Sequence, residues 1–106
     1  MEKPRVVRLE GDWDIARRDE LERLLGPVSD APSEVILDLA SVNYADSTIL
    51  AELVVLRNRR RTKNLPLPRL VIGSPQVRRL FSISGLDQAF PTYDSVPDAQ
   101  AAASAE

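Results

Sequence analysis

Residues 35–52 read VILDLASVNYADSTILAE, and the rest of the chain is organised around this stretch. The apolar and β-branched run at 35–39, interrupted by one aspartate, is typical of a strand buried on both faces. The polar segment 40–45 predicts a turn after that strand. Residues 46–48, Asp-Ser-Thr, precede a long helix with apolar periodicity, and their side-chain oxygens are of the kind that cap a helix start. The stretch therefore places two hydroxyls at the positive end of a helix, a position that favours anions.

Composition limits what such a site does. The chain has 106 residues, of which 43% are hydrophobic and 28% charged, as expected for one globular domain that spans 1–106. It contains neither cysteine nor histidine. Disulfides and thiolate catalysis are therefore excluded, together with the commonest general base and the commonest metal ligand. The net charge of -2 disfavours a general nucleic-acid binder, so we predict no nucleic-acid partner.

The distribution of apolar residues gives no sign of a membrane protein. No apolar run reaches the roughly 18 residues that a membrane-spanning helix needs. The first residues are not followed by the apolar segment of a signal peptide. We therefore expect a cytoplasmic protein with no direct membrane insertion.

Short apolar runs that alternate with helical patterns predict an α/β fold. Gly11 and Asp12 separate two runs of alternating apolar residues, which predicts a β-hairpin over residues 5–15. The predicted order of elements is β-β-α-β-α-β-α-β-α. Strands that alternate with helices pair in parallel, whereas the hairpin adds an antiparallel strand. We therefore expect a single domain with a mixed β-sheet and about four helices.

The helix ends carry recognisable signals. Gly26 and Gly85 are expected to end the first and third helices in the left-handed conformation, and Ser74 is expected to cap the third. The apolar side of that third helix is predicted to comprise Val77, Leu80, Phe81 and Ile83.

Catalysis finds little support in the residues. Ser47 beside Asp46 lacks both a histidine and a G-x-S-x-G motif, and the chain has no glycine-rich phosphate loop. Asp14, Asp38 and Asp46 could approach one another at one end of the sheet and hold Mg²⁺. Separate roles as caps and turn residues are the favoured explanation of these carboxylates. We therefore predict no enzyme, no metal site and no cofactor.

The long helix ends in the basic run RNRRRTK at 57–63. Cations at a helix C-terminus are stabilised by the negative end of the helix dipole, and we favour that explanation. Docking of a partner or of a phosphate is the alternative.

The start of the long helix also suits a switch. A phosphate on Ser47 or Thr48 would add nearly two negative charges, which a helix N-terminus tolerates. Those charges would repel a partner docked on that surface, so binding would be lost without unfolding. The alternative is that residues 46–48 only cap the helix.

Residues 38–50, DLASVNYADSTIL, resemble the pattern D-L-S-x-V-x-F-[IM]-D-S-[ST]-G-L of the STAS domain family. That module is found in anti-sigma factor antagonists and in the cytoplasmic tails of sulfate transporters. Two further segments support the resemblance. Residues 11–15, GDWDI, resemble the family's G-E-L-D hairpin, and residues 77–93 resemble its third helix and last strand. The resemblance covers essentially the whole chain and implies a mixed sheet with helices packed on it.

The resemblance implies a non-catalytic anti-sigma factor antagonist, or anti-anti-sigma factor, that binds an anti-sigma factor which is also a serine kinase. In the family the serine after the motif aspartate is phosphorylated; this corresponds to Ser47, with Thr48 as the alternative acceptor. Phosphorylation blocks binding, and a serine phosphatase restores it. The predicted partner surface comprises the exposed side of the long helix and Gly11, Asp12, Trp13, Asp14, Asp46, Ser47 and Thr48.

Ile49 stands where the family commonly has Gly, and its branched side chain is expected to crowd the junction that a kinase approaches. Constitutive binding and phosphorylation of Thr48 are the alternatives that follow. Two other functions would use the same surface. One is a STAS subunit of a membrane transport complex, such as a lipid-transport ABC system, and the other is a component of a signalling scaffold.

Overall fold

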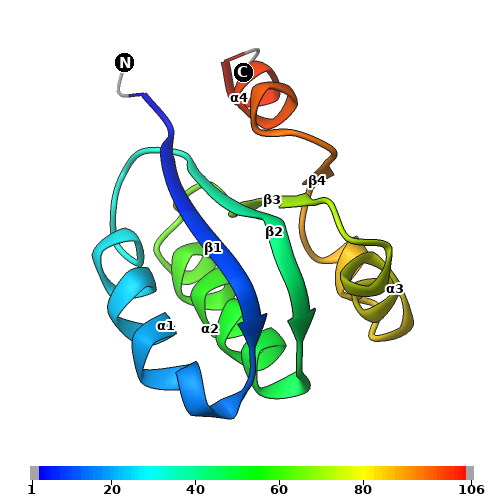
Figure 1. Cartoon of the computed structure of the whole chain (residues 1–106). Helices are drawn as coiled ribbons and strands as arrows, with labels where there is room; N and C mark the ends of the chain where they lie inside the picture. The colour runs from blue at the N-terminus through cyan, green and yellow to red at the C-terminus, as the bar shows by residue number, and fades with distance from the viewer. Residues whose placement is uncertain (1–2, 105–106) are drawn as a thin grey trace.

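The computed structural model describes residues 3–104 and is an α/β domain (Figure 1). The sheet contains β1 (Arg5–Trp13), β2 (Val35–Ala45), β3 (Arg69–Ile72) and β4 (Thr92–Tyr93). The α-helices are α1 (Arg18–Leu25), α2 (Ser47–Thr62), α3 (Pro75–Ile83) and α4 (Val96–Ser104). The strand order is β1-β2-β3-β4, and each neighbouring pair is parallel. The predicted α/β class and its four helices are confirmed.

The predicted hairpin over residues 5–15 is wrong. Residues 5–13 form the single strand β1, which pairs in parallel with β2. Gly11 has φ of 84° inside this strand, where the pairing register shifts, and residues 15–17 form a 3₁₀ turn. A glycine with positive φ serves a β-bulge as well as a hairpin turn, so the local pattern did not distinguish them. Within residues 3–104 the sheet is therefore wholly parallel rather than mixed.

The predicted turn at 40–45 is also wrong, because β2 continues to Ala45. Asp38 Oδ1 accepts a hydrogen bond from the Ala40 N–H at 3.0 Å, and the pairing with β1 becomes irregular there. The polar segment is thus a bulged continuation of the strand. A Cβ on Gly73 would lie 2.8 Å from the Ala40 carbonyl oxygen, so only glycine allows the chain after β3 to approach β2 this closely.

Alternate side chains of β2 point to opposite faces of the sheet. Leu37 and Leu39 join the main core, which also contains residues of α1, α2 and α3. Ile36 points the other way and packs with Val71 and with Ala99 of α4. Figure 1 shows α1 and α2 together on one side of the sheet and α4 on the other. The central strand is therefore buried on both faces, as its apolar run predicted.

The helix-end signals were partly correct. Gly85 has φ of 78°, the predicted left-handed conformation. Gly26 has φ of -51° and is right-handed, because the chain continues into a 3₁₀ turn that contains Pro27. Ser74 precedes α3 but makes no capping hydrogen bond with its side chain.

Candidate partner-binding site

The strands β1 and β2 end next to one another. Trp13 pairs with Ala45, and the backbone N–H of Asp46 donates to the Trp13 carbonyl at 3.1 Å. Because the carboxyl ends of parallel strands lie at the same edge of a sheet, residues 11–14 and 46–48 are brought together. The two segments that the sequence predicted as one surface are therefore adjacent in the fold.

Asp46 is the N-cap of α2. Its backbone is extended, with φ of -99° and ψ of 177°, and its Oδ1 accepts from the N–H groups of Thr48 at 3.0 Å and Ile49 at 3.2 Å. These contacts satisfy two of the N–H groups that the first turn of a helix leaves without a partner. The carboxylate of Asp46 is thus committed to starting the helix.

The two hydroxyls beside Asp46 are not used by the fold. Ser47 is exposed and Thr48 is half-buried. Within residues 3–104 neither side-chain oxygen makes a hydrogen bond. Ser47 is the first residue of a 16-residue helix, so its hydroxyl lies at the positive end of a long dipole. Of the two hydroxyls, that of Ser47 is the more accessible to another protein.

A stripe along α2 continues from Ser47 without a charged residue. Its members are exposed and lie three or four residues apart, the spacing that places side chains on one face of a helix: Ser47, Ala51, Val55 and Asn58. Val55 is 59% exposed although it is apolar. On the flank of the stripe, Glu52 is already paired with Arg18 of α1 at 3.1 Å. The stripe itself carries no charge, and the charged side chains that share a surface hollow with Val55, namely Glu22, Glu52 and Arg59, are each in an ion pair, which makes this α2 stripe suited to docking.

At the end of β1, Trp13 does not lie on the surface, where the family resemblance had placed it as a partner-binding residue. The Trp13 side chain is 1% exposed and its indole N–H donates to the Glu10 carbonyl at 2.9 Å. The guanidinium of Arg17 lies 3.5 Å from the centre of the Trp13 ring and also donates to the Asp12 carbonyl. Trp13 is therefore a core residue, and Arg17 is the side chain that the site presents above it.

Arg17 is also held from the helix side. It pairs with Glu20 at 3.1 Å, and this hydrogen bond lowers the pKa of the Glu20 carboxyl. The same contact raises the pKa of Arg17. Arg17 thus ties the end of β1 to α1 and fixes the position of residues 11–14.

Ile49 does not crowd the junction as the sequence predicted. Its side chain is 2% exposed and belongs to the main core with Leu9, Trp13 and Leu53. Residue 49 is in the first turn of α2, but its side chain faces inward, whereas Ser47 faces solvent. The approach to Ser47 is therefore not obstructed by this departure from the family pattern.

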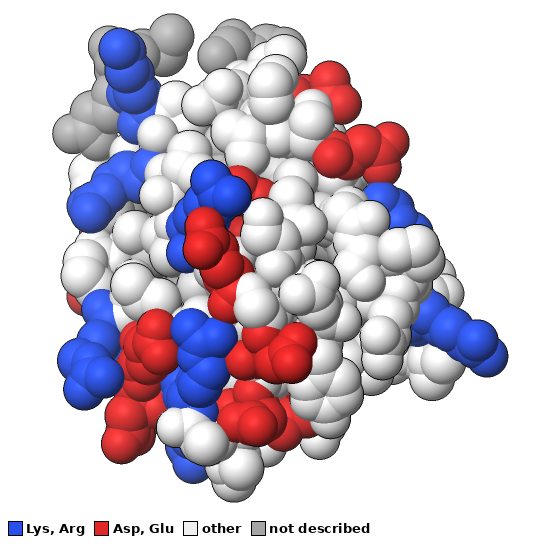
Figure 2. Space-filling view, in the orientation of Figure 1, with Lys and Arg blue, Asp and Glu red and all other residues white. Residues whose placement is uncertain are grey.

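Sequence reasoning missed a cleft on the other side of Ser47. It has a volume of about 420 Å³ and lies between the β2–α2 junction and α3. Its lining residues are Tyr44, Ala45, Asp46, Ser47, Gln76, Val77, Arg79, Leu80 and Ile83. Ile83, which the sequence placed on the apolar side of the third helix, is 74% exposed. Figure 2 shows that charged side chains gather over β1 and α1, while the face over β2 and α3 is largely uncharged.

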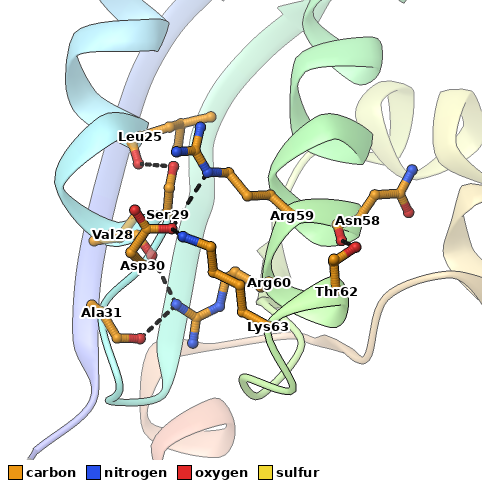
Figure 3. A network of polar contacts seen from close by, with 10 residues as sticks. All are labelled: Leu25, Val28, Ser29, Asp30, Ala31, Asn58, Arg59, Arg60, Thr62 and Lys63. Carbon is orange, nitrogen blue, oxygen red and sulfur yellow. Dashed lines mark hydrogen bonds and ion pairs between the residues drawn. The ribbon is translucent and has the colours of Figure 1, made fainter.

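The basic run at the C-terminal end of α2 has a structural role, as favoured from the sequence, but not chiefly through the helix dipole. The Arg60 side chain is 0% exposed. It donates to the backbone carbonyls of Val28 and Ala31, each at 2.8 Å (Figure 3). It also donates to the carbonyls of Ser33 at 2.9 Å and of Pro66, before β3, at 2.8 Å. Burial lowers the pKa of Arg60. These bonds fix the loop that leads into β2.

Three neighbouring cations, Arg57, Arg59 and Lys63, are also occupied, whereas Arg61 is exposed. Asp30 pairs with Lys63 at 2.6 Å and with Arg59 at 3.4 Å, and the hydrogen bond from Lys63 lowers the pKa of the Asp30 carboxyl (Figure 3). Arg57 donates to the Ala89 carbonyl at 2.6 Å. This end of α2 is therefore engaged in holding loops in place.

The structure gives no support for a metal centre. Among residues 3–104, no group of three or more carboxylates is placed to hold a metal ion. Asp14 accepts from the Ala16 N–H, and Asp38 and Asp46 each accept from backbone N–H groups. Each carboxylate thus acts separately, as favoured from the sequence. In the same part of the chain, no helix has the length and apolar character required to cross a bilayer.

Comparisons with known proteins bear on the family and the fold of the chain. The family model described as the STAS domain matches residues 2–99. A STAS-domain containing protein of Pseudomonas aeruginosa is 27% identical over 85 residues, which cover 80% of this chain and 83% of that protein. The crystal structure of an anti-sigma factor antagonist from Mycobacterium paratuberculosis is similar with a TM-score of 0.82 and 26% identity. That similarity covers 97% of this chain and 87% of the other.

Proposed function

This chain belongs to the STAS domain family, and we propose that it acts as an anti-sigma factor antagonist. It binds an anti-sigma factor through the carboxyl ends of β1 and β2 and the α2 stripe. The similar structure from Mycobacterium paratuberculosis supports the proposal, since it is described as such an antagonist. The observation that carries the proposal is the exposed Ser47 hydroxyl, unused within the described residues, at the head of an uncharged helix face.

Binding follows from the surface chemistry. The α2 stripe offers Val55 with the uncharged Ala51 and Asn58, and the charges that border it are already held in ion pairs. The adjoining charges of Arg17 and Arg18 are already paired with Glu20 and Glu52. Paired charges at the edge of a binding surface contribute more to the orientation of the partner than to its affinity. An anti-sigma factor held on this surface is withdrawn from its sigma factor, so the domain acts on transcription by sequestration in the cytoplasm and not by catalysis.

The partner is proposed to be a serine kinase as well, and Ser47 its substrate. The Ser47 Oγ attacks the γ-phosphorus of ATP, the bond to the ADP oxygen breaks, and the hydroxyl proton passes to the kinase. The phosphoserine carries about -1.5 to -2 charges. A serine phosphatase reverses the step by transferring the phosphoryl group to water. Ser47 is preferred over Thr48 because Thr48 is half-buried.

The consequence of phosphorylation differs between the fold and the complex. At the first position of α2 a negative charge is favoured by the helix dipole, so the domain remains folded. In the complex the same charge would lie against the uncharged α2 stripe and its partner, where desolvation is costly. The modification therefore releases the partner without unfolding the domain.

Co-purification from the native host tests partner identity. The baits are the wild-type chain, Ser47→Ala, Ser47→Asp and Gln100→Glu, which adds the same charge on exposed α4 across the sheet. We expect an anti-sigma factor with wild type, Ser47→Ala and Gln100→Glu, and its loss with Ser47→Asp. Recovery of an ABC-type ATPase subunit instead would favour the transport alternative, and a large homo-oligomer would favour the scaffold alternative.

The switch has its own test. The recovered kinase is incubated with ATP and the wild-type chain, Ser47→Ala or Thr48→Ala, and the products are analysed by mass spectrometry. We expect one phosphate on the wild type and on Thr48→Ala, and none on Ser47→Ala. Absence of phosphate from all three would rule out the switch while leaving binding in place.

A further inference from the structure

The cleft beside Ser47 contains one cation among its described lining residues, Arg79 of α3. Arg79 is exposed, and it makes no hydrogen bond or ion pair with any residue of 3–104. Its neighbour Arg78 is engaged elsewhere, donating to the Ile72 carbonyl and to Asp94, each at 2.9 Å. The helix α3 therefore presents one committed and one uncommitted guanidinium, and the uncommitted one shares a cleft with Ser47.

The start of α2 cannot by itself satisfy a phosphate on Ser47. The N–H groups of Thr48 and Ile49 are already bonded to the Asp46 carboxylate. That carboxylate lines the same cleft, so it repels a second anion. A dianionic phosphate beside it calls for a compensating cation. Arginine suits this role because its planar group donates two parallel hydrogen bonds to phosphate oxygens.

We propose that Arg79 binds the phosphate on Ser47: its guanidinium forms an ion pair with the phosphate across the cleft between the β2–α2 junction and α3. The inference rests on the proposed function in that Ser47 is the modified residue. Pairing closes the cleft over Tyr44, Leu80 and Ile83. Phosphorylation thus has two effects: it places charge on the α2 stripe, and it makes the apolar side chains of the cleft inaccessible to the partner.

Phosphorus NMR tests the pairing without any kinase. Phosphoserine is installed at position 47 during translation in three proteins: the otherwise wild-type chain, Arg79→Gln and Arg78→Gln. A paired guanidinium stabilises the dianion, so the phosphate pKa is expected to be lower by about half a pH unit or more than in Arg79→Gln. Arg78→Gln removes the same charge one residue away and is expected to match the wild type. Equal values in all three proteins, or equal changes in both variants, would overturn the proposal.

Closure of the cleft has an independent readout because the chain has no cysteine. The variant Ile83→Cys carries a single thiol at a position that is 74% exposed in the native chain. We expect phosphoserine at residue 47 to lower the alkylation rate of this thiol several-fold. In a protein that also carries Arg79→Gln, we expect phosphoserine to leave the rate unchanged. If phosphoserine left the alkylation rate unchanged in the protein that retains Arg79, the proposed closure of the cleft would be wrong. Failure of the proposed function would show separately, as absence of phosphate on Ser47 in the host.

Discussion

The C-terminal and N-terminal ends of α2 differ in what occupies their polar side chains. At the C-terminal end Arg60 is buried against four backbone carbonyls, and Lys63 is paired with Asp30. At the N-terminal end Ser47 is exposed, and within the described residues its hydroxyl has no partner. The cationic end is the more conspicuous in the sequence, yet four of its five cations contact other parts of the fold, and among the described residues Arg61 is the exception. The polar end with a free hydroxyl and an adjoining cleft is the one available to other molecules.

The difference shows that availability, more than charge, marks a binding surface. A buried guanidinium that is satisfied by carbonyls holds loops in place and has no donor left for a ligand. An exposed hydroxyl at a capped helix start costs the fold nothing and remains open to modification. One end of α2 is therefore expected to be structural and the other functional, and substitutions at the two ends separate these roles.

The largest expected effect is at Arg60. Arg60→Ala should lower the free energy of unfolding by about 3 kcal/mol, because four carbonyls lose a charged donor. Arg61→Ala, at an exposed neighbour, should change it by less than about 0.5 kcal/mol. Urea denaturation of both variants measures the contrast. Equal stability of the two would contradict a structural role for this end of the helix.

The cap at the other end should matter less. Asp46→Ala removes two hydrogen bonds to the first turn and should cost about 1 kcal/mol of stability. Asp46→Asn keeps a capping oxygen and should retain most of the stability that Asp46→Ala loses. The same urea experiment measures both. If alanine were as stable as asparagine here, the cap would not be what positions Ser47.

A charge at Ser47 should separate stability from binding. Ser47→Asp is expected to change the free energy of unfolding by less than about 0.5 kcal/mol in either direction, since the helix dipole favours an anion there while the Asp46 carboxylate repels it. Affinity for the anti-sigma factor should fall about tenfold or more, whereas Gln100→Glu should bind normally. Thermal unfolding and isothermal titration calorimetry provide the two measurements. Unfolding of Ser47→Asp would show that position 47 is structural.

The smallest effect concerns pH and the Asp30 pairs. Because Lys63 and Arg59 lower the pKa of Asp30, its contribution to stability is present above the pKa of the unfolded state, about 3.9. It is lost as the pH falls through the lower folded-state pKa. The wild type should therefore be slightly more stable than Asp30→Asn at pH 7, and the gap should vanish in strong acid. A gap that is the same at both pH values would contradict the pairing.

Much of the structure at the N-terminal end of α2 followed from the sequence. The Asp-Ser-Thr triplet and the apolar run before it predicted a buried strand and a capped helix, because capping is a local property. The grouping of residues 11–14 with 46–48 came from the family resemblance, and the structure explains it by the parallel ends of β1 and β2. The hairpin was wrong, since the positive φ of Gly11 serves a bulge inside β1.

The remaining features depend on contacts between distant residues. Arg60 bonds to carbonyls 27 to 32 positions earlier in the chain, and no local pattern distinguishes it from its exposed neighbour Arg61. The cleft with Tyr44 and Ile83 exists because of how α3 packs beside the extended end of β2. The burial of Trp13 likewise depends on the bulged strand β1, which the sequence analysis had interpreted as a hairpin.

Hydrogen exchange measured by mass spectrometry, with and without the anti-sigma factor, compares the two ends of α2 directly. We predict that partner binding slows exchange in residues 43–55, at the N-terminal end, and leaves residues 57–66 unchanged. Installation of phosphoserine at 47 should abolish the slowing. Slower exchange confined to residues 57–66, or slowing that persists with phosphoserine, would contradict the assignment of function to the Ser47 end of the helix.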